Sequence, residues 1–260
     1  MKRCARVIQI SDTHLFADPD RLLYGANPYK NLQAVLNAIQ KNNPEVDAIV
    51  VSGDLTQDET LASYQWLKSS LSLLEIPFYW LCGNHDDQAV MMQCCPQAMV
   101  KRVEVNGWQL LLLDSQIPGE IPGELGDDEL AWLAEQLEQY PKTNTLIAVH
   151  HHPCPAGSAW LDQINLQNGK QLEDLISLHG GVRAVVHGHI HQASKKWLGN
   201  TPCYSVPSSC AQFRPESHEF AIDDSRLPGY RVLDLFDDGS LETHVFRVDS
   251  AENPPVDSNG

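Results

Sequence analysis

Five short segments of the chain collect aspartate, asparagine and histidine side chains. In chain order they are Asp12-x-His14, Gly53-Asp54, Gly83-Asn84-His85-Asp86, His150-His151-His152 and Gly188-His189-Ile190-His191. Oxygen and imidazole donors of this kind suit Mn²⁺, Fe²⁺, Zn²⁺ or Co²⁺. Three Asp or Asn oxygens and four imidazoles are too many for one closed tetrahedral site, so the segments predict two ions that share a carboxylate. Two ions about 3.5–4 Å apart are suited to in-line displacement at phosphorus.

Each segment has an ordinary structural interpretation when it is taken alone. Asp12 follows a strand-like run, where an aspartate is often a helix cap or a turn former, and Gly83-Asn84-His85-Asp86 is a good turn sequence. One histidine of the triplet could be a core residue. The pair His189 and His191 would place both rings on one side if the backbone there is extended. Five such segments in this order, each after an apolar run, together favour the metal site.

The elements that position these segments are expected to be strands and helices in alternation. Apolar runs predict strands at 7–10, 48–52, 78–81, 109–113, 146–149, 183–186, 195–198, 203–206, 230–236 and 241–247. Apolar residues at helical spacing predict helices at 28–42, 60–74, near 130–137 and at 172–178. This order predicts an α/β fold with two packed sheets flanked by helices. Side chains at strand ends in such folds face a common crevice, which could collect all five segments.

Composition narrows the class of protein further. The 18 Lys and Arg against 34 Asp and Glu leave a formal charge of −16, which argues against nucleic acid as a partner. No apolar run approaches the ~20 residues that span a bilayer, so no membrane association is expected. Seven cysteines include no Cys-x-x-Cys pair, and the first residues lead into a strand rather than a signal peptide. We expect a cytoplasmic protein with free thiols, built as one domain over 1–248 with a polar, disordered tail at 249–260.

The five segments resemble the calcineurin-like metallophosphoesterases. Their surroundings, Ser11-Asp12-Thr13-His14-Leu15, Gly53-Asp54-Leu55-Thr56-Gln57-Asp58 and Gly188-His189-Ile190-His191-Gln192, resemble the class III cyclic-nucleotide phosphodiesterases, and among them the bacterial 3′,5′-cyclic AMP phosphodiesterases. The resemblance runs from Arg6 to Arg247. It implies an α/β four-layer sandwich, in which two packed mixed β-sheets are flanked by helices and a dinuclear metal site lies at the strand ends.

Carried over position by position, the resemblance implies the ligands of both ions. One ion would be held by Asp12, His14, Asp54 and His191, and the other by Asp54, Asn84, His150 and His189, with Asp54 bridging. The cofactors implied are two divalent transition-metal ions, Fe²⁺ or Mn²⁺ first, with Zn²⁺ or Co²⁺ as alternatives. Gln57 stands where purple acid phosphatases, distant relatives, carry a metal-binding tyrosine, so a tyrosinate-bound ferric site is not expected.

The resemblance also implies a catalytic pair, His85 and Asp86. His85 would contact the phosphate and protonate the leaving oxygen, and Asp86 would orient its ring. The substrate-binding side chains would be His14, Asp54, Asn84, His85, His150 and His191.

The activity expected is hydrolysis of 3′,5′-cyclic AMP to 5′-AMP by in-line attack of a metal-bridging hydroxide. The same centre could instead act on another phosphodiester, a phosphomonoester or a nucleotide pyrophosphate. A third alternative is a non-catalytic scaffold, which the complete ligand set and His85 disfavour. The partner expected is a small-molecule cyclic nucleotide, and the chain could be a monomer or a homodimer.

Overall fold

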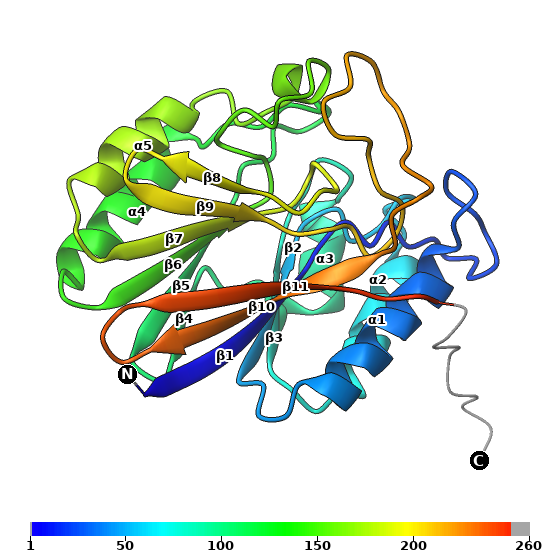
Figure 1. Cartoon of the computed structure of the whole chain (residues 1–260), viewed down its shortest axis with the longest axis horizontal. Coiled ribbons are helices and arrows are strands. Elements are labelled where there is room, and N and C mark those ends of the chain that lie inside the picture. The colour runs from blue at the N-terminus through cyan, green and yellow to red at the C-terminus, as the bar shows by residue number, and fades with distance from the viewer. Residues whose placement is uncertain (1, 251–260) are drawn as a thin grey trace.

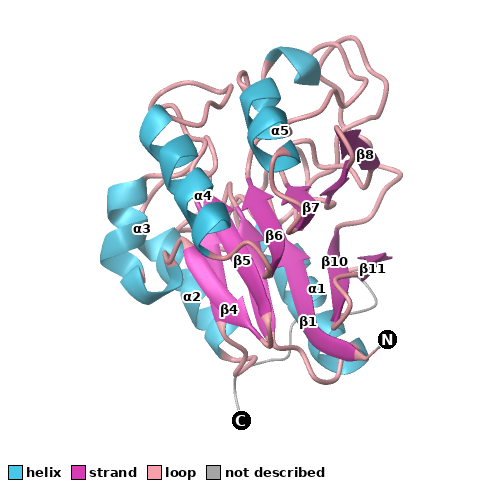
Figure 2. Ribbon diagram, turned by 90° about the vertical axis from the view of Figure 1, so that its left-hand side faces the viewer, coloured by secondary structure: helices cyan, strands magenta, loops and turns pink. Residues whose placement is uncertain are grey.

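Two β-sheets pack face to face and carry helices on both outer sides (Figure 1, Figure 2). The computed structural model describes residues 2–250. Met1 and residues 251–260, and with them most of the predicted C-terminal tail, lie outside the described part of the chain. The architecture below therefore concerns residues 2–250.

The first sheet has five strands in the order β11-β10-β1-β2-β3. Their bounds are β1 (Arg3–Ile10), β2 (Ala48–Ser52), β3 (Phe78–Leu81), β10 (Gly229–Phe236) and β11 (Leu241–Arg247). β1, β2 and β3 run parallel, whereas β10 and β11 join antiparallel. The carboxyl ends of the three parallel strands therefore lie at one edge, where three of the five polar segments follow them.

The second sheet has six strands in the order β4-β5-β6-β7-β9-β8. Their bounds are β4 (Arg102–Val105), β5 (Trp108–Leu113), β6 (Asn144–Val149), β7 (Val182–His187), β8 (Lys195–Leu198) and β9 (Thr201–Ser205). The four central strands are parallel, and β4 and β8 are antiparallel strands at the two edges. The remaining two polar segments follow β6 and β7.

Helices cover the outer face of each sheet and complete four layers. They are α1 (Pro28–Asn42), α2 (Leu61–Ser72), α3 (Gln88–Cys94), α4 (Asp127–Gln139) and α5 (Gly169–Ser177), with 3₁₀ turns at Pro96–Ala98 and Leu161–Gln163. Apolar residues of α1, α2 and α3 pack on the first sheet, and those of α4 and α5 pack on the second. A third apolar layer, including Val7, Val50, Leu110 and Ala148, fills the space between the sheets.

The predicted fold class is confirmed, but one strand and one α-helix were not predicted. The unpredicted elements are β4 and α3. The turn Asn106-Gly107 after β4 is a typical hairpin sequence, and both residues have positive φ, 47° and 92°, as such a turn requires. That signal could have located β4. For α3, the only local mark is its cap, since the Asp87 carboxylate accepts hydrogen bonds from the backbone N–H of Ala89 and Val90.

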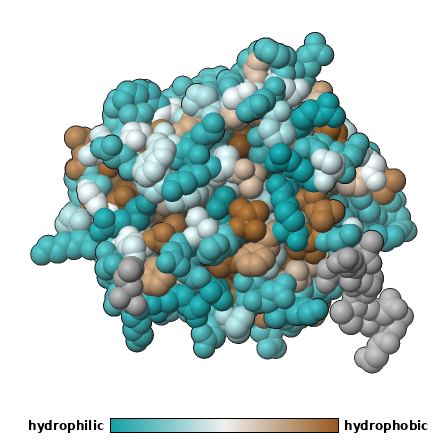
Figure 3. Space-filling view, viewed as in Figure 1, coloured by the Kyte–Doolittle hydropathy of each residue, from teal (hydrophilic) through white to brown (hydrophobic). Residues whose placement is uncertain are grey.

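The face drawn in Figure 3 is mostly hydrophilic, and its apolar residues form small separate patches. Among the helices described within 2–250, none combines the length and the apolar character that crossing a membrane requires.

Candidate dinuclear metal centre

All five polar segments meet where the parallel strands of both sheets end. The segments that follow β1, β2 and β3 come from the first sheet, and those that follow β6 and β7 come from the second. Backbone hydrogen bonds hold neighbouring segments together: Asp12 N donates to Gly53 O at 3.0 Å, and Gly188 N donates to His150 O at 3.1 Å. The segments that were expected to share a crevice therefore meet along the line where the two sheets adjoin.

The first group of donors joins the end of β1 to the segment after β7. His14 Nε2 lies 3.2 Å from His191 Nε2, which in turn lies 3.2 Å from Asp12 Oδ1. Asp54 Oδ2 approaches to 3.8 Å from His14 Nε2. All four side chains are buried, and one donor atom each of Asp12, His14 and His191 lies within 4.8 Å of the others. Such a cluster could hold a metal ion.

The second group of donors lies around His150. Its Nε2 is 3.2 Å from Asn84 Oδ1, 3.2 Å from His189 Nδ1 and 3.4 Å from Asp54 Oδ2. Asp54 Oδ2 therefore faces His14 of the first group and His150 of the second. That is the place that a carboxylate shared by two ions would take.

The outer ring nitrogens of three histidines are bound to backbone carbonyls. His150 Nδ1 lies 2.8 Å from Ser52 O, His189 Nε2 lies 3.0 Å from Ile164 O, and His191 Nδ1 lies 2.8 Å from Ala211 O. A carbonyl only accepts, so each outer nitrogen carries a hydrogen and, in a neutral ring, leaves the inner nitrogen as a bare lone pair. The inner lone pairs of His150 and His189 then face each other at 3.2 Å, an arrangement that requires a proton or a cation between them. The donor set therefore fits divalent metal ions.

The pKa shifts within the cluster also fit a site for divalent metal ions. Burial lowers the pKa of His150, but the Asp54 carboxylate outweighs burial and raises it to about 9. Burial and the neighbouring His151 and His150 hold the pKa of His189 well below its usual range. For Asp54, burial raises the pKa, and the His150 ring outweighs this and brings it well below the usual value. A divalent ion would compete with the His150 proton for the same lone pair, so metal binding would release that proton.

Five candidate ligands have left-handed backbone conformations. Their φ angles are 54° at Asp12, 46° at His14, 50° at Asp54, 69° at His189 and 50° at His191. Positive φ is uncommon outside glycine and tends to gather at functional sites, where the surrounding structure enforces it. The segment Gly188–His191 is therefore not extended, contrary to the geometry considered from the sequence. His189 joins the His150 group and His191 joins the Asp12 group.

His85 stands beside these donors with one ring nitrogen already held. Its Nδ1 lies 3.2 Å from Gln57 Nε2, and its ring meets the edge of His14 with centroids 5.3 Å apart. Its backbone N–H donates to Asp54 Oδ1 at 2.8 Å, and the side chain is half-buried. With the Gln57 amide as donor, Nδ1 accepts and the neutral ring carries its proton on Nε2. Sequence reasoning missed this contact, although Gln57 belongs to the same motif as Asp54.

The contacts of Asp86 differ from the prediction that it orients His85. Within residues 2–250, no hydrogen bond joins the two side chains. The Asp86 carboxylate instead accepts from four groups: the backbone N–H of Leu55, Thr56 and Gly83, and the hydroxyl of Tyr64. Burial, helped by the charge of Asp54, raises its pKa to about 7. Asp86 therefore fixes the turns that carry Asp54 and Asn84, and it is Gln57 whose side chain lies within hydrogen-bond distance of the His85 ring.

The other two histidines of the triplet, His151 and His152, do not share the contacts that His150 makes with Asp54 and Asn84. His151 Nδ1 lies 2.7 Å from Ser115 Oγ and its Nε2 lies 3.0 Å from Ile121 O, so both ring nitrogens are engaged. His152 is buried, and burial together with His187 holds its pKa well below the usual range. Its ring stacks on that of His189, with the ring centroids 5.6 Å apart. Of the three, His150 is the residue that meets Asp54 and Asn84.

Comparisons with known proteins show which family the chain belongs to. A family model described as calcineurin-like phosphoesterase matches residues 5–193, which include all five segments. The chain is 41% identical to the 3′,5′-cyclic adenosine monophosphate phosphodiesterase CpdA of Escherichia coli (strain K12), over 98% of this chain and 94% of that protein. It is 39% identical to the protein of the same name from Pseudomonas aeruginosa, over 94% of this chain and 90% of that protein.

A solved structure shows the same fold at low identity. The crystal structure of a dimetal phosphatase from Danio rerio covers 95% of this chain and is itself covered completely, with a TM-score of 0.68 and 13% identity. This likeness concerns the fold alone. The near full-length sequence matches and the family model carry the assignment: the chain belongs to the calcineurin-like phosphoesterase family.

Proposed function

We propose that the chain is a metal-dependent phosphodiesterase that hydrolyses 3′,5′-cyclic AMP to 5′-AMP. The observation that carries the proposal is a cluster of six buried Asp and His donors with the half-buried Asn84 beside them, in a chain 41% identical, almost end to end, to a protein named for this activity. Two divalent ions, Fe²⁺ or Mn²⁺ first and Zn²⁺ or Co²⁺ as alternatives, would occupy the cluster. When bound, they supply a nucleophile at neutral pH and neutralise charge on the phosphate.

The ligand roles follow from the two groups of donors. Asp12, His14 and His191 would hold one ion, and Asn84, His150 and His189 the other, with Asp54 shared by both. The carbonyl contacts of His150, His189 and His191 support these roles, because they fix each ring with its lone pair toward the cluster. Part of the same set, His14, Asp54, Asn84, His150 and His191, would bind the substrate phosphate together with His85.

His85 would act as the general acid. Opening the cyclic phosphodiester at the 3′ oxygen expels a sugar alkoxide, which is a poor leaving group and requires a proton as the P–O bond breaks. The Gln57 contact supports this role, because it holds the half-buried ring at Nδ1 and leaves Nε2 as the nitrogen from which the imidazolium form would deliver the proton. Gln57 would be a positioning residue for that proton.

The wider setting suits a small intracellular substrate. An acidic chain with a formal charge of −16 repels long polyanions, whereas a small monoanion can reach a local site of positive potential. We therefore place the protein in the cytoplasm as a single catalytic domain over 1–248, without a nucleic-acid or membrane partner.

Product analysis tests the proposal directly. The metal-loaded protein would be incubated with 3′,5′-cyclic AMP, with 2′,3′-cyclic AMP and with a nitrophenyl phosphomonoester, and the products separated by chromatography. We expect 5′-AMP as the sole product from the first substrate, and elemental analysis should find two transition-metal ions per chain. Fast cleavage of the phosphomonoester without turnover of cyclic AMP would contradict the proposed substrate while leaving the metal centre intact.

A further inference from the structure

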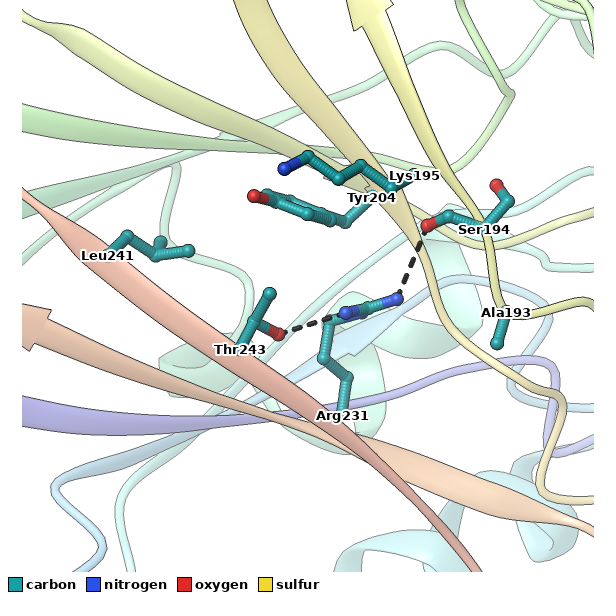
Figure 4. A pocket seen from close by; sticks show the side chains of 7 residues that line it. All are labelled: Ala193, Ser194, Lys195, Tyr204, Arg231, Leu241 and Thr243. Atoms are coloured by element: carbon teal, nitrogen blue, oxygen red, sulfur yellow. Dashed lines mark hydrogen bonds between the residues drawn. The ribbon is translucent and has the colours of Figure 1, made fainter.

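A polar pocket lies where the edges of the two sheets meet, outside the metal centre. It has a volume of about 440 Å³ and lies between the β8–β9 edge of one sheet and the β10–β11 edge of the other. Figure 4 shows Arg231 reaching from β10 toward Ser194 and Thr243, with Lys195 and Tyr204 above it. None of the residues that line the pocket is acidic, although the chain contains 34 Asp and Glu residues.

Arg231 is a buried cation without an anionic partner in this pocket. Arg231 is only 5% exposed to solvent. Across residues 2–250, no carboxylate lies within ion-pair distance of its guanidinium. Its acceptors are all neutral: Ser205 O, Ser194 O and Thr243 Oγ1. A charge removed from water in this way is normally compensated by an opposite charge. Burial lowers the pKa of Arg231 to about 10, which leaves it charged at neutral pH.

One N–H group of the Arg231 guanidinium has no hydrogen-bond acceptor among the described residues. Nε donates to Ser205 O, Nη2 donates to both Ser205 O and Ser194 O, and Nη1 donates to Thr243 Oγ1 at 2.9 Å. A guanidinium has five N–H groups, so one on Nη1 has no acceptor among the described residues. Thr243 cannot serve a ligand as a donor, because its own hydroxyl donates to Val232 O at 2.8 Å.

Two further donors face the same space. Lys195 Nζ lies 5.8 Å from the centre of the Tyr204 ring, and Arg231 Cζ lies 5.1 Å from it, so both cations lie close to this ring. No ion pair involves Lys195, and no hydrogen bond involves the Tyr204 hydroxyl, anywhere in the described range 2–250. Figure 4 shows the ammonium and the hydroxyl at the same end of their side chains, above Leu241.

We propose that this pocket binds a small oxyanion, the phosphate or carboxylate group of a metabolite, between Lys195 Nζ, Tyr204 Oη and Arg231 Nη1. The pocket offers two positive charges, unused N–H and O–H donors and no competing carboxylate. An oxyanion accepts from all three groups and supplies the charge that Arg231 lacks. The site is independent of the phosphodiesterase proposal, because it uses none of the residues of the metal centre.

Variants of Lys195 and Tyr204 test the site without disturbing the fold. Lys195 is exposed, and Lys195→Met removes its charge, while Tyr204→Phe removes only a hydroxyl. Lys196→Met is the matched control, because it removes the same charge from the adjacent position, whose side chain points to the other face of β8. Arg231 is left in place, since its carbonyl contacts join the two sheets. Calorimetric titrations of the metal-loaded protein would use sodium sulfate and sodium succinate as probes.

The expected result is a difference between neighbouring lysines. Lys195→Met should weaken binding of the better probe about tenfold or more, Tyr204→Phe should weaken it several-fold, and Lys196→Met should leave it within about twofold. Any binding at the metal centre is common to all variants and cancels in the comparison. Tighter sulfate binding would identify a phosphate group as the natural ligand, and tighter succinate binding a carboxylate. Equal losses in the two lysine variants, or no heat of binding from millimolar probe in the wild type, would overturn the proposal.

Discussion

Gly83 lies so close to the Asp54 carboxylate that a single methyl group should disable the metal centre. A Cβ built on Gly83 would lie 2.9 Å from Asp54 Cγ, and closer still to its Oδ1 and backbone nitrogen. The φ angle of Gly83 is not positive, so Gly83→Ala adds no backbone strain of its own. The whole effect of this substitution should therefore come from displacing Asp54.

The size of the displacement follows from ordinary contact distances. Carbon atoms rest about 3.5–4.0 Å apart, so the Asp54 carboxylate must move by roughly 0.6 Å or more. The same carboxylate faces His14 and His150 and accepts from the His85 backbone, so all three contacts would change together. A misplacement near 1 Å at a reacting centre can lower the rate about 10²-fold. Overpacking of a dense interior also costs about 1–3 kcal/mol, which would lower the melting temperature by roughly 2–12 °C in a domain of this size.

Three measurements on one pair of variants check this reasoning. Gly83→Ala should show reduced metal content by elemental analysis, a loss of phosphodiester turnover of about 10²-fold, and a lower melting temperature. The matched control is Gly180→Ala, because a Cβ on Gly180 would meet nothing within 4 Å and its φ is not positive. It should behave as the wild type in all three. A Gly83→Ala protein with full metal content and wild-type turnover would refute the claim that the Asp54 carboxylate is tightly positioned.

The remaining predictions concern the proposed ligands and the proposed acid. Asp54→Ala should lose both metal ions by elemental analysis because its carboxylate faces both groups of donors, whereas Asn84→Ala should lose mainly one; two retained ions in Asp54→Ala would contradict a bridging role. His85→Ala should slow cyclic AMP hydrolysis about 10²–10⁴-fold at unchanged metal content, and should slow a nitrophenyl phosphodiester much less, since nitrophenolate leaves without a proton. Equal losses on the two substrates would mean that His85 binds the phosphate rather than protonating the leaving group. Gln57→Leu should remove the hydrogen bond to His85 Nδ1 and lower cyclic AMP turnover up to about tenfold, again with little effect on the nitrophenyl ester; an equal effect on both would argue for a merely structural contact.

The sheets and most helices could be predicted because their signals are local. The helix Pro28–Asn42 and the strand Ala48–Ser52 have the predicted bounds, since apolar spacing in one and a continuous apolar run in the other are set by neighbours in the sequence. The helix Gln88–Cys94 escaped prediction because seven residues are too few for a periodic pattern. Its start depends on one capping carboxylate.

The sequence predicted which polar side chains come together, but it did not predict their hydrogen-bond partners. Asp86 adjoins His85 in sequence, and only the fold shows that Tyr64 of α2 and the backbone after Asp54 take up its carboxylate. Gln57 meets His85 across 28 residues of chain for the same reason. The Arg231 pocket is likewise built by contacts between the edges of two sheets, so no local pattern marks it.

The backbone at the ligands explains why the spacing of His189 and His191 was misleading. An extended chain would turn both rings to one side, but positive φ at both residues sends His189 to the His150 group and His191 to the Asp12 group. A left-handed non-glycine residue costs on the order of 1–3 kcal/mol, and five of them approach the net stability of a whole domain, about 5–15 kcal/mol. Aspartate and histidine tolerate this conformation better than β-branched residues, which lowers that cost. The rest must be offset by the three apolar layers around the sheets and by backbone contacts such as those that the Asp12 carboxylate accepts from His189 N at 3.1 Å. The candidate ligands are therefore held by the fold in a geometry that their own backbones would not adopt alone, as a preorganised metal centre would require.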